Sequence, residues 1–154
     1  MMAKKVAIVM GSKSDSAVAE KAEAVFKEFG IEYETVVMSA HRTPIKVKKF
    51  AASLEDNGYG VVIGIAGLAA HLPGVLASLT VLPVIGVPVA AGPLNGEDAL
   101  LAIVQMPPGI PVATVGIGNA KNAALLAVQM LASGDASLFN AIKKYRKQFG
   151  DDDQ

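Results

Sequence analysis

The stretch 57–96 contains no Asp, Glu, Lys or Arg, although the chain as a whole has 14 basic and 14 acidic residues. An apolar segment of about 20 residues can span a bilayer, so a membrane helix is one alternative for this stretch. Glycine and proline recur along it, however, and divide it into pieces the length of strands and turns. Parallel strands that are buried on both faces have such a composition. The stretch therefore predicts the central strands of a parallel sheet rather than a membrane span.

Five apolar runs rich in β-branched residues alternate with segments whose apolar residues have helical spacing. The expected strands are residues 5–10, 31–38, 61–66, 81–87 and 112–117. The expected helices are residues 16–29, 44 to about 57, a short one after Pro73, 98–105 and about 119–132. Gly30 is expected to end the first helix, and Thr43 and Pro44 to cap and open the second. This alternation predicts a three-layer α/β fold, a right-handed, doubly wound parallel sheet in the flavodoxin-like strand order.

An extra helix, residues 135–149, follows the alternating pattern, with its apolar residues on one face. Two interpretations stay open: it packs on its own domain, or it is an arm that docks on a neighbouring subunit. Residues 1–150 are expected to form a single domain, and residues 151–154 a polar tail. The first residues lead directly into a strand and leave no room for a signal peptide, so a cytoplasmic protein is expected.

Composition narrows the class of partner. The basic and acidic residues cancel, which argues against nucleic acid or a membrane surface, because those partners need a clustered positive excess. The chain has no cysteine, so disulfides and thiolate chemistry are excluded, and two histidines alone offer few ligands for a metal. A small-molecule ligand is therefore expected. The high apolar content also suggests surfaces covered by other subunits.

Three polar clusters each follow a predicted strand: residues 11–15 (Gly-Ser-Lys-Ser-Asp), 39–44 (Ser-Ala-His-Arg-Thr-Pro) and 69–74 (Ala-Ala-His-Leu-Pro-Gly). The carboxyl ends of parallel strands meet at one edge of a sheet, so these clusters are expected to surround one ligand. The first and third strands are neighbours in the flavodoxin-like order. The crevice is therefore expected between the first and third clusters.

The first cluster is suited to a phosphate, because it combines backbone N–H groups, the hydroxyls of Ser12 and Ser14, and a helix N-terminus. Asp15 is suited to accept hydrogen bonds from a sugar diol. The alternative is that Ser14 or Asp15 simply caps the helix. The cluster has neither the Walker spacing nor the Gly-x-Gly-x-x-Gly fingerprint, so neither ATP hydrolysis nor NAD binding is implied.

The other two clusters hold both histidines. Arg42 offers a fork of donors for a phosphate, and the neighbouring His41 can transfer a proton near neutral pH. The alternative for this pair is a solvated loop, and for His71 a hydrogen-bonded structural histidine. No zincin spacing, nucleophile elbow or acidic pair appears. These observations leave a cofactor-free reaction on a phosphorylated small molecule.

These motifs, together with Ile-Val-Gln-Met-Pro at 103–107, resemble the PurE family, and the resemblance runs from about Lys5 to Lys147. The family comprises the N5-carboxyaminoimidazole ribonucleotide mutase of purine (IMP) biosynthesis and a related aminoimidazole ribonucleotide carboxylase that uses CO2 directly. The resemblance implies an isomerase that moves a carboxylate from the exocyclic nitrogen to the adjacent ring carbon. It implies no metal, ATP or flavin. It also implies a homo-octamer, functionally coupled to an ATP-dependent carboxyaminoimidazole ribonucleotide synthetase.

The resemblance also implies roles for individual residues. His41 would be the general acid and base, Ser12 and Arg42 would hold the phosphate, and Asp15 would bind the ribose hydroxyls. The base and carboxylate would be lined by a set of mostly small residues: Ser39, Gly67, Ala70, His71 and Leu72.

His-Arg-Thr-Pro and Ala-His-Leu-Pro-Gly resemble the mutase branch, because the carboxylase branch tends toward His-Lys-Thr and lacks the second histidine. The chain departs from the mutase pattern in two places: Leu68 stands where mutases usually have glycine, and residues 90–93 replace a more polar stretch. The alternatives to a mutase are a direct carboxylase and a non-catalytic module that binds a phosphoribosyl ligand.

Overall fold

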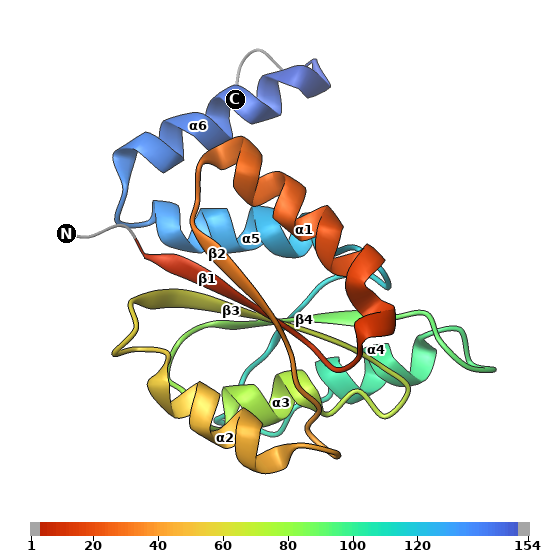
Figure 1. Ribbon diagram of the computed structural model, residues 1–154. Helices are drawn as coiled ribbons and strands as arrows, with labels where there is room; N and C mark the ends of the chain where they lie inside the picture. The colour runs from red at the N-terminus through yellow and green to blue at the C-terminus, as the bar shows by residue number, and fades with distance from the viewer. Residues whose placement is uncertain (1–3, 151–154) are drawn as a thin grey trace.

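A computed structural model describes residues 4–150, which contain a five-stranded sheet with helices on both faces (Figure 1). All strand pairs are parallel, and the strand order is β2-β1-β3-β4-β5. The strands are β1 (Lys5–Met10), β2 (Tyr33–Val37), β3 (Tyr59–Gly67), β4 (Val84–Val89) and β5 (Ala113–Thr114). The order confirms the predicted flavodoxin-like arrangement, with β1 and β3 as neighbours.

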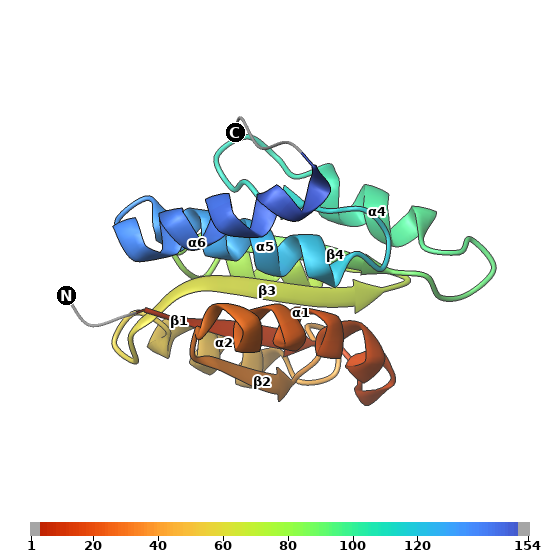
Figure 2. The ribbon, with the colours of Figure 1, turned by 90° about the horizontal axis from the view of Figure 1, so that it is seen from above.

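Helices α1 (Ser16–Phe29) and α5 (Ala120–Ala132) cover one face of the sheet (Figure 1). The other face carries α2 (Pro44–Ser53), α3 (Leu72–Ala77) and α4 (Glu97–Val104). Helix α6 (Ala136–Arg146) continues into the short helix η2 (Lys147–Phe149) and lies outside α5, away from the sheet (Figure 1), so that it overlies α5 when the molecule is seen from above (Figure 2). A further short helix, η1 (Lys13–Asp15), precedes α1.

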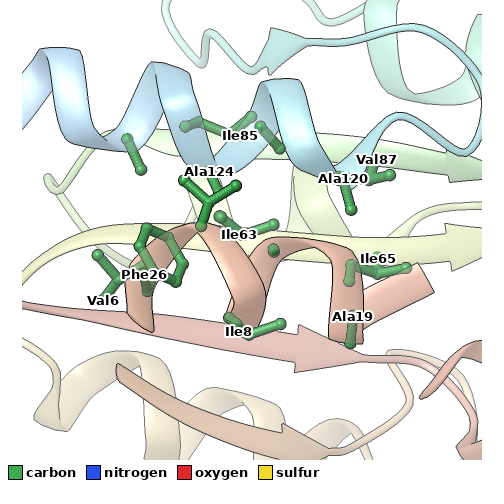
Figure 3. Close-up of a cluster of buried hydrophobic side chains, with 14 of the residues drawn as sticks. Val6, Ile8, Ala19, Phe26, Ile63, Ile65, Ile85, Val87, Ala120 and Ala124 are labelled. Atoms are coloured by element: carbon green, nitrogen blue, oxygen red, sulfur yellow. The ribbon is translucent and has the colours of Figure 1, made fainter. Parts of the chain in front are cut away.

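Each face of the sheet has its own hydrophobic core. On the first face, Phe26 of α1 packs over Ile8 and Ile63 of the sheet, and all three side chains are fully buried (Figure 3). Alanines such as Ala124 let α5 approach the strands closely. Burying one such large apolar side chain contributes about 1.5–3 kcal/mol, so these contacts fix both helices on the sheet.

The charge-free stretch forms the middle of the sheet. Every residue of β4 is buried, and so is every residue of β3 except Gly67. Burial on both faces explains why these strands carry no charge. Within residues 4–150, no helix combines the length and the apolar character that crossing a membrane requires.

A pair of facing glycines sets the position of α3. Gly64 of β3 and Gly86 of β4 are paired in the sheet. A Cβ added at Gly64 would lie 3.1 Å from Pro73, and one added at Gly86 would lie 3.3 Å from Pro73 and overlap Ile103. The absence of side chains here lets Pro73 rest on the sheet. The loop just before Pro73 is thereby held at the carboxyl edge of β3.

Several predicted boundaries shift. The fourth strand starts at Val84 rather than residue 81, since Val81 is 85% exposed and Pro83 meets the sheet only through its carbonyl, which accepts from Val62 N. The fifth strand shrinks from residues 112–117 to Ala113–Thr114, an edge strand that pairs only with β4. The second strand starts at Tyr33 rather than residue 31.

The reason for that last shift is the end of α1. Gly30, in the left-handed conformation at φ 64°, ends the helix as predicted. Ile31 N then donates to Phe26 O at 2.9 Å, which closes the helix end and delays the start of β2.

The predicted C-terminal helix 135–149 corresponds to α6 and η2, and the Asp135 carboxylate caps it by accepting from Ser137 N and Leu138 N. Leu138 and Ile142 pack against the core of their own subunit. Phe139 and Phe149, in contrast, are 52% and 72% exposed. The predicted polar tail 151–154 lies outside the described residues.

Candidate active site

The carboxyl ends of β1, β2 and β3 open onto one cavity of about 470 Å³. The structure thereby brings the three polar clusters together, as the sheet order requires. Of the predicted site residues, those that line the cavity are Ser12, Ser14, Asp15, Ser39, His41, Arg42, Gly67, His71 and Leu72. Ala70 is 1% exposed and packs in the core beneath them instead.

The first cluster forms a turn around the Ser12 hydroxyl. Ser12 Oγ accepts from Ser14 N at 3.3 Å and lies 2.9 Å from Ser14 Oγ, so Ser12 caps the short helix η1. Asp15 stands at the N-cap position of α1 but makes no capping hydrogen bond with its side chain. The interpretation of Ser14 or Asp15 as the helix cap is therefore wrong.

Asp15 is the buried carboxylate of this cavity, with 8% of its surface exposed. Burial raises its pKa above the ordinary value of 3.8, and hydrogen bonds from the Ser14 side chain and the Ser12 backbone act in the opposite direction. A buried carboxylate with free acceptor capacity is suited to bind neighbouring hydroxyl groups.

The second cluster is a tight turn held by two hydroxyls. Ser39 Oγ accepts from the backbone N–H groups of His41 and Arg42, at 3.3 and 3.2 Å. Thr43 Oγ1 accepts from Ser39 N at 2.9 Å and donates to Ser39 O at 3.1 Å. Thr43 therefore closes this turn and its side chain does not cap α2, contrary to the prediction, whereas Pro44 does open the helix.

Arg42 links the second cluster to the first. Its Nη2 donates to the carbonyl oxygen of Gly11 at 2.9 Å. The guanidinium has five N–H donors in all, and the side chain is exposed to the cavity. Ser12 and Ser14 line the same cavity, so the remaining donors are available to an anionic ligand there.

The two histidines meet across the cavity. His41 Nε2 lies 2.7 Å from His71 Nδ1, and the ring planes are inclined at 83°. One ring nitrogen must donate and the other accept, so the tautomer of each ring depends on the other. Both side chains are exposed to the cavity, and the hydrogen bond that His71 makes is to the other histidine of the site.

The residues after β3 and β4 form the apolar wall of the cavity. Ala91 lines it but was not predicted from the sequence, because the fourth strand was expected to end at residue 87 and its loop was not counted. Ala66 lines it from within β3 and was expected only as part of the third strand. Leu68 also lines it, at φ 54°. The two departures from the family pattern touch each other here: a Cβ added at Gly92 would lie 2.6 Å from Leu68 Cδ2.

Acidic and histidine side chains do not gather into a metal site. Residues 4–150 contain no group of three or more His, Cys, Asp or Glu side chains that could hold a metal ion. The polar groups of the cavity are instead arranged as two sets, hydroxyls with a guanidinium and a carboxylate in one and the histidine pair in the other. Such a site can bind an anionic ligand and move a proton.

Comparison with known proteins agrees with the resemblance in the sequence. The family model described as AIR carboxylase matches residues 5–152. The N5-carboxyaminoimidazole ribonucleotide mutase of Pyrococcus abyssi is 55% identical over 143 residues, which cover 93% of this chain and 82% of that protein. The mutase of the same name from Escherichia coli K12 is 52% identical over 145 residues, 93% of this chain and 86% of the relative.

Solved structures share the fold. A crystal structure of a single-residue variant of Treponema denticola PurE2 superposes with a TM-score of 0.89 at 32% identity and covers 98% of this chain and 94% of its own. A second, of Treponema denticola PurE, has a TM-score of 0.88 at 32% identity, with 97% and 93% covered. Since the family model spans nearly the whole length and relatives more than half identical span most of it, this chain belongs to the AIR carboxylase family.

Proposed function

We propose that this protein is an N5-carboxyaminoimidazole ribonucleotide mutase, which converts that compound to 4-carboxy-5-aminoimidazole ribonucleotide in purine biosynthesis. The observation that carries the proposal is the pairing of His41 and His71 in a cavity that also holds Arg42 and Asp15. The chain is more than half identical to proteins that carry this name. The substrate is a small nucleotide, and its size and charge suit the cavity.

The phosphate and ribose are assigned to the end of the cavity near β1. Ser12, Ser14 and Arg42 hold the phosphate, because their hydroxyls and guanidinium lie beside the start of η1 and α1. Asp15 accepts hydrogen bonds from the ribose hydroxyls. Its burial supports this role, since an ionised carboxylate in such a place is stabilised by donors on the ligand.

The imidazole ring and its carboxylate are assigned to the other end. Ser39, Gly67, His71 and Leu72 surround them, and small residues there let a flat ring approach the backbone closely. Ala70 belongs to the same segment and supports Leu72 and His71 from the core, since its own side chain lies outside the cavity lining.

The reaction needs one proton carrier and an enclosed space. Breaking the bond between the exocyclic nitrogen and the carboxyl carbon releases CO2, and His41 gives a proton to that nitrogen. The adjacent ring carbon then attacks the CO2, and His41 removes the ring-carbon proton, which restores aromaticity. The proton given in the first step is regained in the second, so His41 ends as it began. His71 sets the His41 tautomer through their 2.7 Å contact.

A direct carboxylase, which would take CO2 from solution, is the second candidate, because the matching family model is described as AIR carboxylase. The second histidine favours the mutase: by resemblance it marks that branch, and here it contacts the first. A module that binds a phosphoribosyl ligand without chemistry is the third candidate. Binding without chemistry would not require the two histidines to contact each other in the cavity.

Homo-octamer assembly is part of the proposal. Large apolar side chains remain exposed at several places on one subunit: Val81, Leu94, Leu101, Val104, Phe139 and Phe149. Exposed apolar side chains in such number are typical of surfaces that pack against other subunits. Leu138 and Ile142 attach α6 to its own subunit, and its outward Phe139 is available to a neighbour. We further propose a cytoplasmic location and functional coupling to an ATP-dependent synthetase that supplies the carbamate.

The test is to offer the purified protein each substrate separately. Carboxyaminoimidazole ribonucleotide is given in one reaction, and aminoimidazole ribonucleotide with dissolved CO2 in the other, and formation of the ring-carboxylated product is followed. Rapid product from the first alone supports the mutase. Efficient product from the second identifies a carboxylase, and no product from either favours a binding module. The His41→Asn variant is the matched control, with turnover expected to fall roughly 10²- to 10⁴-fold.

A further inference from the structure

Leu68 adopts a backbone conformation that leucine rarely takes. Its φ is 54°, in the left-handed region, and within residues 4–150 Asn95 is the only other non-glycine residue with positive φ. Asparagine tolerates this region, whereas a bulky aliphatic residue there is strained. Glycine would accept the same backbone without strain. The strained backbone at Leu68 must therefore be held in place by its surroundings, because such strain persists only where the neighbouring structure enforces it.

Its surroundings are the cavity and the loop after β4. We call residues 90–96 the fourth loop. Leu68 lines the cavity and is 52% exposed, so one side of the leucine faces the ligand space. Its Cδ2 lies against Gly92 of the fourth loop, where an added Cβ would be only 2.6 Å away. Leu68 therefore lies between the ligand space and this loop.

The neighbouring backbone brings the same two segments together. Gly67 pairs with Val89 at the ends of β3 and β4, and a Cβ added at Gly67 would lie 3.2 Å from Ala91 Cβ. The fourth loop turns sharply, with positive φ at Gly92, Asn95 and Gly96. Ala91 of this loop lines the cavity, as Leu68 does. A shift of the fourth loop would thus open the cavity wall.

We propose that Leu68 is a positioning residue that holds the fourth loop against the cavity and keeps water out on that side, so that released CO2 is recaptured. This inference rests on the proposed mutase function. If CO2 escapes after the nitrogen–carbon bond breaks, the nitrogen that received the proton remains as the neutral amino group of aminoimidazole ribonucleotide, and the CO2 is hydrated in solution. Leucine offers no hydrogen bond to water, and its side chain fills the space between the cavity lining and Gly92 of the fourth loop.

The experiment follows the fate of the carboxylate in a single turnover. Enzyme in excess receives substrate labelled with ¹⁴C in the carbamate, in buffer with unlabelled bicarbonate, and label is counted in the ring-carboxylated product and in solution. Spontaneous loss is subtracted with an enzyme-free sample. Wild type is expected to retain most of the label. Leu68→Gly, which accepts the backbone but lacks the side chain, is expected to release several times more.

Three further variants sharpen the result. Leu68→Met keeps an apolar side chain and should retain label as wild type does. Leu68→Asn tolerates positive φ but is polar, and should leak as Leu68→Gly does, which preserves the test if the glycine variant folds poorly. Asn95→Gly relaxes the other residue at positive φ and should leave retention unchanged. Equal retention by Leu68→Gly, Leu68→Asn and wild type would overturn the inference.

A reciprocal change tests the contact itself. Gly92→Ala keeps the leucine, but its added Cβ would overlap Leu68 Cδ2 and the positive φ at this position would strain the fourth loop. Label loss is therefore expected, and adding Leu68→Gly should cause no further loss. Additive losses in the double variant would contradict the contact as the cause. Failure of the proposed mutase function has a different signature, since wild type itself would then form no ring-carboxylated product.

Discussion

His41 Nε2 lies 2.7 Å from His71 Nδ1, although the two residues are 30 positions apart and belong to loops after different strands. A contact this short requires an N–H on one ring and a lone pair on the other, so one histidine donates and the other accepts. The ring planes are nearly perpendicular, at 83°. The pair therefore acts as a unit in which a change to either histidine alters the hydrogen-bonding state of the other.

Replacing His71 is expected to act through this contact. His71→Leu removes the partner of His41 and should lower kcat, because the His41 ring then loses its fixed orientation and tautomer. His71→Asn offers a short amide in place of Nδ1 and should recover part of the loss. Steady-state kinetics of both variants give the comparison. Equal activity of the leucine and asparagine variants would show that the contact with His41 is not how His71 acts.

Arg42 is expected to contribute to nucleotide affinity. Arg42→Ala should weaken binding of aminoimidazole ribonucleotide by about 1.5–3 kcal/mol, the range for a hydrogen bond to a charged group. The change also removes the bond to Gly11 O that joins the first two clusters. Calorimetric titration measures the affinity, with Lys48→Ala on the exposed side of α2 as the control for lost positive charge. Unchanged affinity of the arginine variant would show that Arg42 does not bind the phosphate.

Asp15 is expected to make stability depend on pH. Burial raises its pKa above 3.8 in the native state, so in the window just above pH 3.8 the native state binds more protons than the unfolded chain. The free energy of unfolding therefore falls as pH rises through that window, and the cost of the buried charge is fully present at neutral pH.

Asp15→Asn, which has no charge to bury, should consequently melt at a higher temperature than wild type at pH 7. The difference should shrink as pH falls toward 3.8. Thermal unfolding followed by circular dichroism over this range measures it, with Asp56→Asn at an exposed turn as the control. A gain that is the same at every pH would rule out charge burial as its cause. The same variant should bind nucleotide more weakly, since the ribose loses a charged acceptor.

Gly86 is expected to be intolerant of a side chain. A Cβ there would overlap Ile103 Cγ2 and crowd Val112 and Pro73, so Gly86→Ala should destabilise the protein by about 1–3 kcal/mol through overpacking. Gly134→Ala is the matched control, because no heavy atom lies within 4 Å of the added Cβ and its φ is not in the left-handed region. Urea unfolding of the two variants gives the difference. Equal midpoints would mean that α3 and α4 can move away from the sheet without cost.

Local patterns in the sequence were enough to predict much of the fold. Hydrophobic periodicity is a property of neighbouring residues, and it identified five strands, the helices between them and the end of α1 at Gly30. Parallel order then followed from the alternation, since a strand, helix, strand unit has one handedness. The placement of His41, Arg42 and His71 after strands predicted that they would share one cavity, because parallel strands end at a common edge.

Contacts between distant segments decided the rest. Where β4 begins and how short β5 is depend on hydrogen bonds to other strands, which residue type alone does not reveal. The same is true of Thr43, whose side chain bonds Ser39 rather than capping α2, and of Ala70, which lies below the cavity it was expected to line.

The sequence by itself determined the order of the elements and the chemical groups at the strand ends, since both depend on residue types and their spacing along the chain. Only the tertiary structure decided that the His41 and His71 rings touch and that Leu68 rests on Gly92. The physical reason is that hydrogen bonds and close packing act over a few ångströms, so distances between loops are fixed only after the sheet has aligned the strands that carry them.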